Sequence, residues 1–182
     1  SGGIDPRDDL SGFSVGSVNS VDTHGDTVAL AVEADSPASD GRVAFYDASG
    51  TNNFLGSAPT GLLPDLVKFT PDGNTVLVAN EGEPSDNYGS DPKGSVSVID
   101  VSGSDGFSNP SEQKAGFGGF DATSLREDGV RVFGPGSTAS QDLEPESVVA
   151  GPNSETAYVS LQENNAIAIM DISDSSNPTV DS

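Results

Sequence analysis

One three-strand pattern occurs three times along the chain, and this repetition limits the fold more than any other feature. The first long strand of each copy starts with Thr, over residues 27–33, 75–81 and 156–162. The next strand ends in Asp, over residues 41–47, 94–100 and 165–171. A shorter β-prone segment precedes each pair, around residues 18–21, 66–70 and 147–150. Self-similarity of this kind is typical of proteins built from stacked repeats.

Turn residues separate the strands of each copy. The clearest turn is Pro71-Asp72-Gly73, and a fourth strand is expected around residues 54–58. Four antiparallel strands in roughly 40–50 residues are the size of a β-propeller blade. A β-sandwich also has strands every 8–12 residues or so, but it does not require the same signature to recur. The sequence therefore predicts an all-β fold of about three to four propeller blades, forming a partial ring.

The expected blade units cover residues 15–58, 62–120 and 144–182, and an elaborated connection covers 102–143. Within the connection we expect a short helix capped by Asp121 and a strand over Val130–Phe133. Because propeller rings need about 4–8 blades, two blade faces would stay open. We expect the remaining blades of a longer chain to cover them, with self-association as the alternative. The start, Ser1 to Asp5, is interpreted as a processed or truncated beginning.

Charge limits the partners and the habitat. The chain has 29 Asp and Glu against 7 Lys and Arg, a formal net charge of −22. This charge argues against binding to nucleic acid or insertion into an anionic membrane. A disordered acidic chain is one alternative, but the acids lie between well-patterned apolar strands. We therefore predict a high-salt habitat, in which molar salt shortens the Debye length to roughly 3 Å and screens the repulsion.

The residues that several common kinds of catalytic or metal site require are missing from the sequence. The chain has no Cys and a single His, His24, so thiolate chemistry, a Ser-His-Asp triad and a zinc site are not expected. The Gly-rich segment 116–120 lacks the Lys-Ser/Thr of a phosphate-binding loop, so no organic cofactor is expected. Phe45, Phe69 and Tyr158 are interpreted as core residues. No apolar run approaches the ~18 residues of a membrane span.

Acidic residues concentrate in the loops that a propeller would bring to one rim. Nine carboxylates are expected there: Asp65, Glu81, Glu83, Asp86, Asp91, Asp142, Glu144, Glu146 and Glu163. Ca²⁺ takes 6–8 oxygen ligands in flexible geometry, which such loops supply. The predicted metal ligands are Asp65, Glu81, Glu83, Glu144, Glu146 and Glu163. The alternative is that these acids only face solvent, and that Pro145 only sets the entry of a strand.

Several longer motifs carry a resemblance to a known family. They are GLLPDLVKFTPDG at 61–73, VANEGEP at 78–84, VFGPG at 132–136, QDLEPE at 141–146 and AYVSLQENNAIA at 157–168. With these motifs the chain resembles the choice-of-anchor I family from about residue 15 to 172. The resemblance implies the N-terminal half of a lactonase-like, seven-bladed propeller in a secreted or surface-anchored protein. Family members are often labelled alkaline phosphatase or mesenchyme-specific cell-surface glycoprotein.

The functional hypotheses follow from the rim and the resemblance. The first is a non-enzymatic extracellular or cell-surface module that binds a partner or ligand on its acidic face, with Ca²⁺ as the candidate ion. The alternative is a metal-dependent phosphoesterase, of the alkaline phosphatase or phytase type, or part of one. A metal-dependent lactonase is the third hypothesis.

Overall fold

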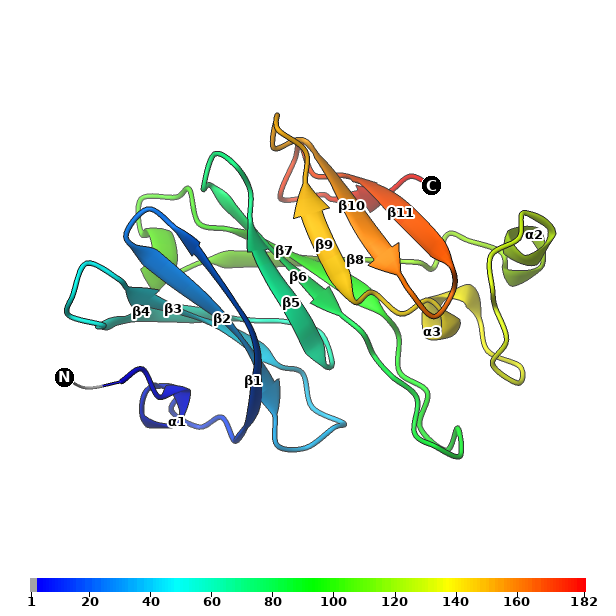
Figure 1. The fold of residues 1–182 in the computed structure, drawn as a ribbon, viewed down its shortest axis with the longest axis horizontal. Helices are drawn as coiled ribbons and strands as arrows, with labels where there is room; N and C mark the ends of the chain where they lie inside the picture. Colours follow the sequence, from blue (N-terminus) through cyan, green and yellow to red (C-terminus); the bar gives the residue numbers. More distant parts are fainter. Residues whose placement is uncertain (1–2) are drawn as a thin grey trace.

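The computed structural model describes residues 3–182, so Ser1 and Gly2 of the expected processed start lie outside the described residues. The chain forms three four-stranded antiparallel sheets, each with its strands in sequence order. Figure 1 shows them side by side along the longest axis, not closed into a ring. The prediction of an all-β fold with partial propeller-like blades is confirmed, with three blades among the described residues.

The strand bounds follow the predicted repeat. The first sheet contains β1 (Val15–His24), β2 (Thr27–Ala34), β3 (Arg42–Asp47) and β4 (Phe54–Pro59). The second contains β5 (Pro64–Phe69), β6 (Thr75–Asn80), β7 (Ser95–Asp100) and β8 (Ser111–Gly116). The third contains β9 (Ser147–Ala150), β10 (Thr156–Leu161), β11 (Ala166–Asp171) and β12 (Thr179–Val180). Short helices are α1 (Pro6–Asp9), α2 (Ala122–Glu127), α3 (Ala139–Asp142) and a 3₁₀ turn at Gly106–Ser108.

The recurring Thr and Asp occupy the same place in every sheet. The strand register pairs Thr27 with Asp47, Thr75 with Asp100, and Thr156 with Asp171. Each Asp accepts a hydrogen bond from the backbone N–H two residues later, at 2.8, 2.8 and 2.9 Å. Such Asx-type turns end a strand by giving the backbone N–H a local partner. The repeat signature is therefore structural: it terminates the third strand of each blade.

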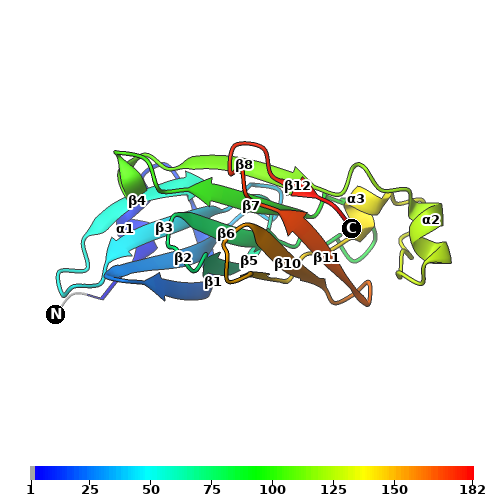
Figure 2. The same cartoon turned by 90° about the horizontal axis from the view of Figure 1, so that it is seen from above.

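The sheets stack through their apolar faces. Between the first and second sheets lie Phe45, Phe69 and Val76, and between the second and third lie Leu77 and Met170. The second sheet is thus covered on both faces, which explains the nearly continuous apolar run in β6. Figure 2 shows the same stack from above. Each fully buried Val or Leu side chain contributes about 1.5–3 kcal/mol, so this stacking is the main force holding the blades together.

The two outer faces of the stack differ. The far face of the first sheet, which includes Leu30 and Tyr46, is covered by Leu10 and Phe13 of the N-terminal segment. The far face of the third sheet leaves Tyr158 44% and Ile167 67% exposed. The prediction that Tyr158 is a core residue is wrong, because no element among residues 3–182 packs over this face. Phe45 and Phe69 are buried as predicted.

The connection between the second and third sheets contains one expected and one unexpected result. Asp121 caps α2 as predicted, its Oδ1 accepting from the N–H groups of Thr123 and Ser124, both at 3.0 Å. Residues 130–133 do not form the predicted strand. Their N–H groups bond elsewhere, Arg131 to the carbonyl of Asn164 and Phe133 to the carboxylate of Asp142, so no neighbouring strand is paired.

Candidate acidic binding rim

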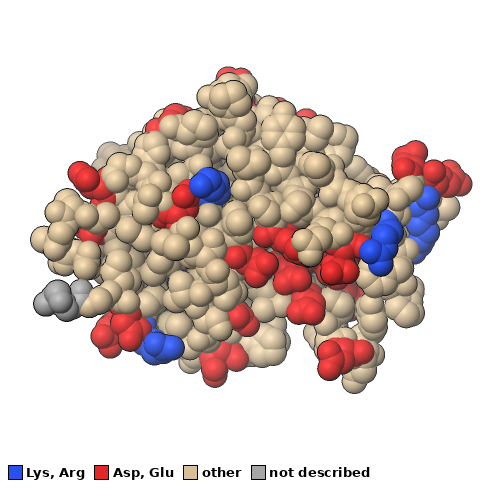
Figure 3. All heavy atoms as spheres, in the orientation of Figure 1, with Lys and Arg blue, Asp and Glu red and all other residues tan. Residues whose placement is uncertain are grey.

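The predicted acidic segments meet at one end of the second and third sheets. This end carries the start of β5, the loop from β6 to β7, the approach to β9 and the turn between β10 and β11. Backbone hydrogen bonds hold it together, from the N–H of Glu81 to the carbonyl of Leu63 and from the N–H of Glu146 to that of Ser160. Figure 3 shows acidic side chains gathered in the lower middle of this face.

One buried side chain positions the approach to β9. Asn164 is completely buried in the turn between β10 and β11. Its Oδ1 accepts from the N–H of Glu144 at 3.1 Å, and its Nδ2 donates to the carbonyl oxygens of Arg131 and Asp142 at 2.7 and 2.5 Å. The sequence predicted its neighbour Glu163 at the rim but not this role of Asn164. An Asn beside a tight turn was the available signal, but its three long-range partners follow only from the fold.

Six carboxylates interact electrostatically at this end, and we refer to them together as the acidic rim. They are Asp65, Glu81, Glu83, Glu144, Glu146 and Glu163. These are the six predicted metal ligands, and the fold brings them to a common place. No Lys or Arg forms an ion pair with any of them among residues 3–182. The rim is therefore a concentration of negative charge without a bonded cation.

Two rim residues carry strongly raised pKa values. Desolvation raises the pKa of Glu81 to about 7, and the charges of Asp65, Glu83, Glu144 and Glu146 add to the effect. Desolvation also raises the pKa of Glu144 to about 7, with contributions from Asp142, Glu163, Glu83 and Glu146. Burial and like charge both disfavour the ionised form of a carboxyl group. Near neutral pH these two groups therefore keep a proton far more readily than an ordinary carboxyl group.

Two further rim acids also have raised pKa values. Burial raises the pKa of Asp65, and burial with the charges of Glu163 and Asp65 raises that of Glu146. Glu83 and Glu163 are exposed. Within the described part of the chain, no three His, Cys, Asp or Glu side chains come close enough together to hold a metal ion. Ca²⁺ at this rim therefore stays a prediction, and it needs a rearrangement of side chains.

Three of the nine expected rim acids have other positions or partners. Asp142 is 4% exposed, and its two oxygens accept from the N–H groups of Phe133 and Gly134 at 2.7 and 2.6 Å. Asp91 accepts from the hydroxyl of Ser137 at 2.7 Å. Asp86 is exposed in the loop between β6 and β7 and is not among the main causes of the raised pKa values. Asp142 and Asp91 thus serve the local structure of the connection.

The single histidine lies far from the rim. His24 ends β1, and its ring packs 5.7 Å from that of Phe69, at the end of the sheets that carries the Pro71-Asp72-Gly73 turn. It is therefore not a candidate base for chemistry at the acidic rim. Among residues 3–182 no helix is both long and apolar enough to cross a membrane.

Comparison with solved structures supports the fold alone. A functionally unknown protein from Desulfotomaculum acetoxidans DSM 771 has a TM-score of 0.56 and 17% identity, over 91% of this chain and 41% of that one. A eukaryotic initiation factor has a TM-score of 0.51 and 13% identity, over 91% and 31%. Kuenenia stuttgartiensis hydrazine synthase has a TM-score of 0.52 and 15% identity, over 84% and 38%. The chain thus spans less than half the length of these solved proteins.

Comparison with sequence families is more specific. No curated protein matches the chain significantly. The sequence profile of the choice-of-anchor I domain matches residues 6–180, which include all three sheets and the acidic rim. This match agrees with the motifs that carry the resemblance, from the GLLPDLVKFTPDG segment to the AYVSLQENNAIA segment. The chain therefore belongs to the choice-of-anchor I family, which indicates a cell-surface or extracellular β-rich module.

Proposed function

We propose that this surface module binds a cationic ligand, or a cationic patch on a partner, at its acidic rim. The observation that carries the proposal is the pair of raised pKa values of Glu81 and Glu144, in a group of six acids that has no basic partner among residues 3–182. Crowded, partly buried carboxylates oppose folding when they ionise, and a bound cation relieves that cost. A bound cation would therefore stabilise the rim.

Ca²⁺ is the ion that best suits these side chains. It accepts carboxylates from flexible loops at varied geometry, whereas Mg²⁺ requires near-octahedral ligands. Glu83 and Glu163 are exposed and lie in the loops that follow β6 and β10, so their side chains are free to turn inward toward Glu144. Binding therefore combines buried acids already in place with exposed acids that close around the ion.

The test is calcium binding measured by titration calorimetry at pH 6 and pH 8. Because a cation favours the ionised form of Glu81 and Glu144, binding should release protons near neutral pH and strengthen toward pH 8. The variants Glu81→Gln and Glu144→Gln should each weaken binding at least about tenfold, close to one interaction of 1.4 kcal/mol. Glu155→Gln, which changes an exposed acid at the other end of the sheets, is the matched control.

Two results would contradict the proposal. One is no calcium uptake at millimolar concentration, and the other is equal binding by all four proteins. The hydrolase alternative is tested on the same proteins with a chromogenic phosphate ester, with and without Ca²⁺. Turnover that Glu144→Gln abolishes would replace the binding-only function by metal-dependent phosphoesterase activity.

A high-salt setting is the second part of the proposal. It is supported by the net charge of −22 and by the small number of ion pairs among residues 3–182, which join Arg7 to Asp5, Lys68 to Asp22 and Lys114 to Asp40. Most acids thus repel one another without compensation, and salt screens that repulsion. Circular dichroism should show a folded β protein in molar KCl and a largely unfolded chain in dilute buffer. Identical spectra would refute the high-salt setting.

The exposed face of the third sheet suggests a further partner. Tyr158, Ile167 and Ile169 form part of an apolar surface that nothing covers among the described residues. We expect it to pack against further blades of a longer chain or against a second copy of this one. Sedimentation of the wild type and of the Ile167→Lys variant distinguishes further blades from a second copy. A dimer that the substitution dissociates identifies the second copy, and a monomer in both cases excludes it.

A further inference from the structure

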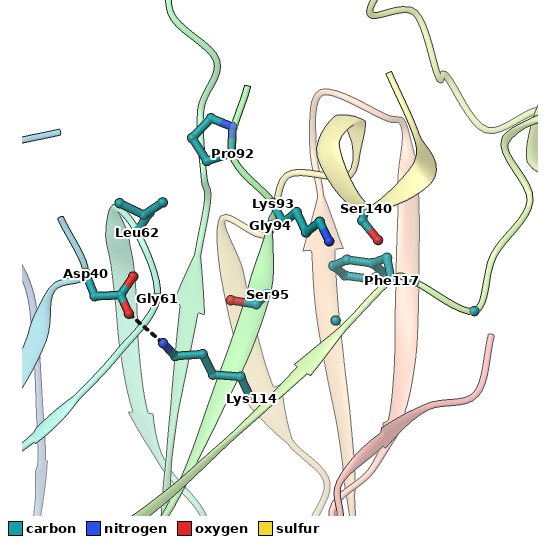
Figure 4. A pocket seen from close by; sticks show the side chains of 13 residues that line it. Asp40, Gly61, Leu62, Pro92, Lys93, Gly94, Ser95, Lys114, Phe117 and Ser140 are labelled. Carbon is teal, nitrogen blue, oxygen red and sulfur yellow. Dashed lines mark hydrogen bonds and ion pairs between the residues drawn. The ribbon is translucent and has the colours of Figure 1, made fainter. Parts of the chain in front are cut away.

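A cavity of different chemistry lies beside the acidic rim. Its volume is about 670 Å³, within the range of small-molecule sites, and we refer to it as the lysine cavity. Its walls come from the segments before β5 and β7, from the end of β8 and from α3 (Figure 4). The cavity and the rim are neighbours, because a Cβ atom added to Gly94, which lines the cavity, would lie 3.2 Å from the carbonyl oxygen of Glu81.

Basic side chains are few in this protein, and two of them line the cavity. The sequence has three lysines, and two of them, Lys93 and Lys114, line this one cavity. Lys114 forms an ion pair with Asp40 at 2.8 Å. Lys93 has no carboxylate partner in the part of the chain that the structure describes. Figure 4 shows the Lys93 side chain extending on the side that Ser140 and Phe117 line.

Hydrogen-bond directions leave the Ser95 hydroxyl as a donor. Ser97 donates its hydroxyl proton to Glu112 at 2.9 Å, so it accepts from the Nδ2 of Asn80 at 3.0 Å. This fixes the orientation of the Asn80 amide, whose Nδ2 also donates to the Oγ of Ser95 at 3.2 Å. Ser95 is therefore an acceptor in the protein, and its own proton remains available to a ligand. The cavity wall is accordingly rich in donors.

Further donors come from α3 and from the turn after β8. Ser140 lines the cavity, and its hydroxyl has no hydrogen-bond partner among residues 3–182. Gly118 and Gly119 also line it, and their N–H groups donate to no backbone or side-chain acceptor there. Neither glycine has a side chain to keep a ligand away from the backbone. Two ammonium groups, two hydroxyls and two N–H groups thus surround one space, together with one carboxylate, that of Asp40, which is paired with Lys114.

We propose that the lysine cavity binds an oxyanion, either a carboxylate or a phosphate group. Lys93 supplies the free positive charge, and Ser95, Ser140 and the Gly118-Gly119 backbone supply hydrogen bonds. Charge-assisted hydrogen bonds to an oxyanion are about twice as strong as neutral ones, which favours this class over an uncharged ligand. The site does not depend on the acidic rim, since none of the six rim acids lines it.

The experiment is a titration of the full chain by two-dimensional amide NMR, with inorganic phosphate in one arm and acetate in the other, at fixed ionic strength. The amide signals of Gly94, Gly118 and Gly119 should shift with a saturable dependence and an apparent Kd in the millimolar range. Lys93→Gln should weaken the binding at least fivefold. Arg7→Gln removes the same charge from an exposed site on α1 and should leave it unchanged.

The other outcomes identify the chemical class of the ligand and distinguish the lysine cavity from the acidic rim. Saturation by phosphate alone assigns a phosphoryl ligand, by acetate alone a carboxylate, and by both a general oxyanion site. Glu144→Gln should leave oxyanion binding intact, so a failure of calcium binding at the rim does not bear on this cavity. Shifts that stay linear for both anions, or that Lys93→Gln does not change, would overturn the proposal.

Discussion

Acidic side chains lie at both ends of the sheets, but their pKa values are shifted in opposite directions. At the end where the third strand of each blade finishes, hydrogen bonds from Thr51 and Ser49, from Ser102 and from Ser173 lower the pKa values of Asp47, Asp100 and Asp171. At the other end, desolvation and like charge raise the pKa values of Glu81 and Glu144 to about 7. A carboxylate with local donors is stabilised in its charged form, and a crowded one without donors is not.

This difference indicates which acids serve the fold and which are available for binding. The Asp residues of the turn end recur at one position in each blade and have their backbone partner two residues away. The rim acids come from the start of β5 and from several loops, and among residues 3–182 their carboxylates accept no hydrogen bond comparable to those in these turns. Acids that already bond to the protein leave little for a ligand, whereas the rim carboxylates retain their acceptor capacity. Substitutions of the two kinds of acid should therefore change stability in opposite directions.

The largest expected effect is at Asp22, which joins the first two sheets near the turn end. Its Oδ2 accepts from the N–H of Phe69 at 2.8 Å, and its Oδ1 accepts from Lys68 at 2.9 Å. Burial opposes ionisation of this carboxyl group, but the bonds from Phe69 and Lys68 outweigh it and lower the pKa. Asp22→Ala leaves the Phe69 N–H unpaired and should reduce the free energy of unfolding by about 2–3 kcal/mol.

Urea unfolding at pH 7 in molar salt measures this loss. Asp22→Asn keeps an acceptor oxygen for Phe69 and should cost less than Asp22→Ala. Equal losses for the two variants would show that the hydrogen bond across the sheets contributes nothing.

The second effect is a gain of stability at the rim. The folded pKa values of Glu81 and Glu144 lie above their ordinary value of about 4.5, so the folded state holds protons that the unfolded state has lost. Stability therefore falls as the pH rises from about 4.5 to about 7 and then levels off. Glu81→Gln or Glu144→Gln should remove part of this fall and stabilise the protein by about 1–2 kcal/mol at pH 8, after allowance for solvent screening.

The measurement is thermal or urea unfolding at pH 4.5 and pH 8 in the absence of Ca²⁺. At pH 4.5 each Gln variant should match the wild type, because the replaced Glu is protonated in the fold. A variant that is less stable than the wild type at pH 8 would show that these acids are bonded, and the contrast between the two ends would fail.

The smallest effect is at the Asp residues that end the blades. Asp100 accepts from the N–H and hydroxyl of Ser102 at 2.8 and 2.7 Å and from Ser175 of the third sheet at 3.1 Å. Asp100→Ala should cost about 0.5–1.5 kcal/mol at pH 7. Because its folded pKa is lowered, this contribution is present above about pH 4 and disappears as the pH falls through the folded pKa.

Asp171→Ala is the comparison for Asp100→Ala. Asp171 has the same turn but, among residues 3–182, no side-chain hydrogen bond to another sheet. Asp171→Ala should therefore lower the melting temperature of the protein by less than Asp100→Ala. A larger fall at Asp171 would mean that the bond from Ser175 to Asp100 does not help to hold the sheets together.

Much of the fold could be predicted because its signals are local. The signals that predicted β6, its turn and the α2 cap each act within a few residues. They are the apolar run of β6, the Pro71-Asp72-Gly73 turn and the Asp121 cap. Residues 130–133 were mispredicted because their apolar character suits a strand, while their actual partners, Asn164 and Asp142, are distant or belong to another element. The exposure of Tyr158 was missed because burial depends on what packs over a face.

Of the two candidate sites, the acidic rim could be predicted in part and the lysine cavity could not. The sequence placed the six rim acids at one end, since the repeat fixes where each loop emerges. It placed both Glu144 and Asp142 at the rim and named only Glu144 as a metal ligand. It gave no sign that Glu144 is crowded by like charge or that Asp142 is held by two backbone N–H groups. The lysine cavity was not foreseen, because its two lysines lie on different strand ends and meet only in the folded chain.

By itself, then, the sequence determined the strands of the blade repeat, the family and the large negative charge. Only the tertiary structure decided which acids are satisfied, which are crowded, which apolar face stays open and where two lysines meet. The reason is physical: strand and turn preferences act between near neighbours in the chain, whereas desolvation and Coulomb interactions depend on distances that only the packing of the three sheets sets.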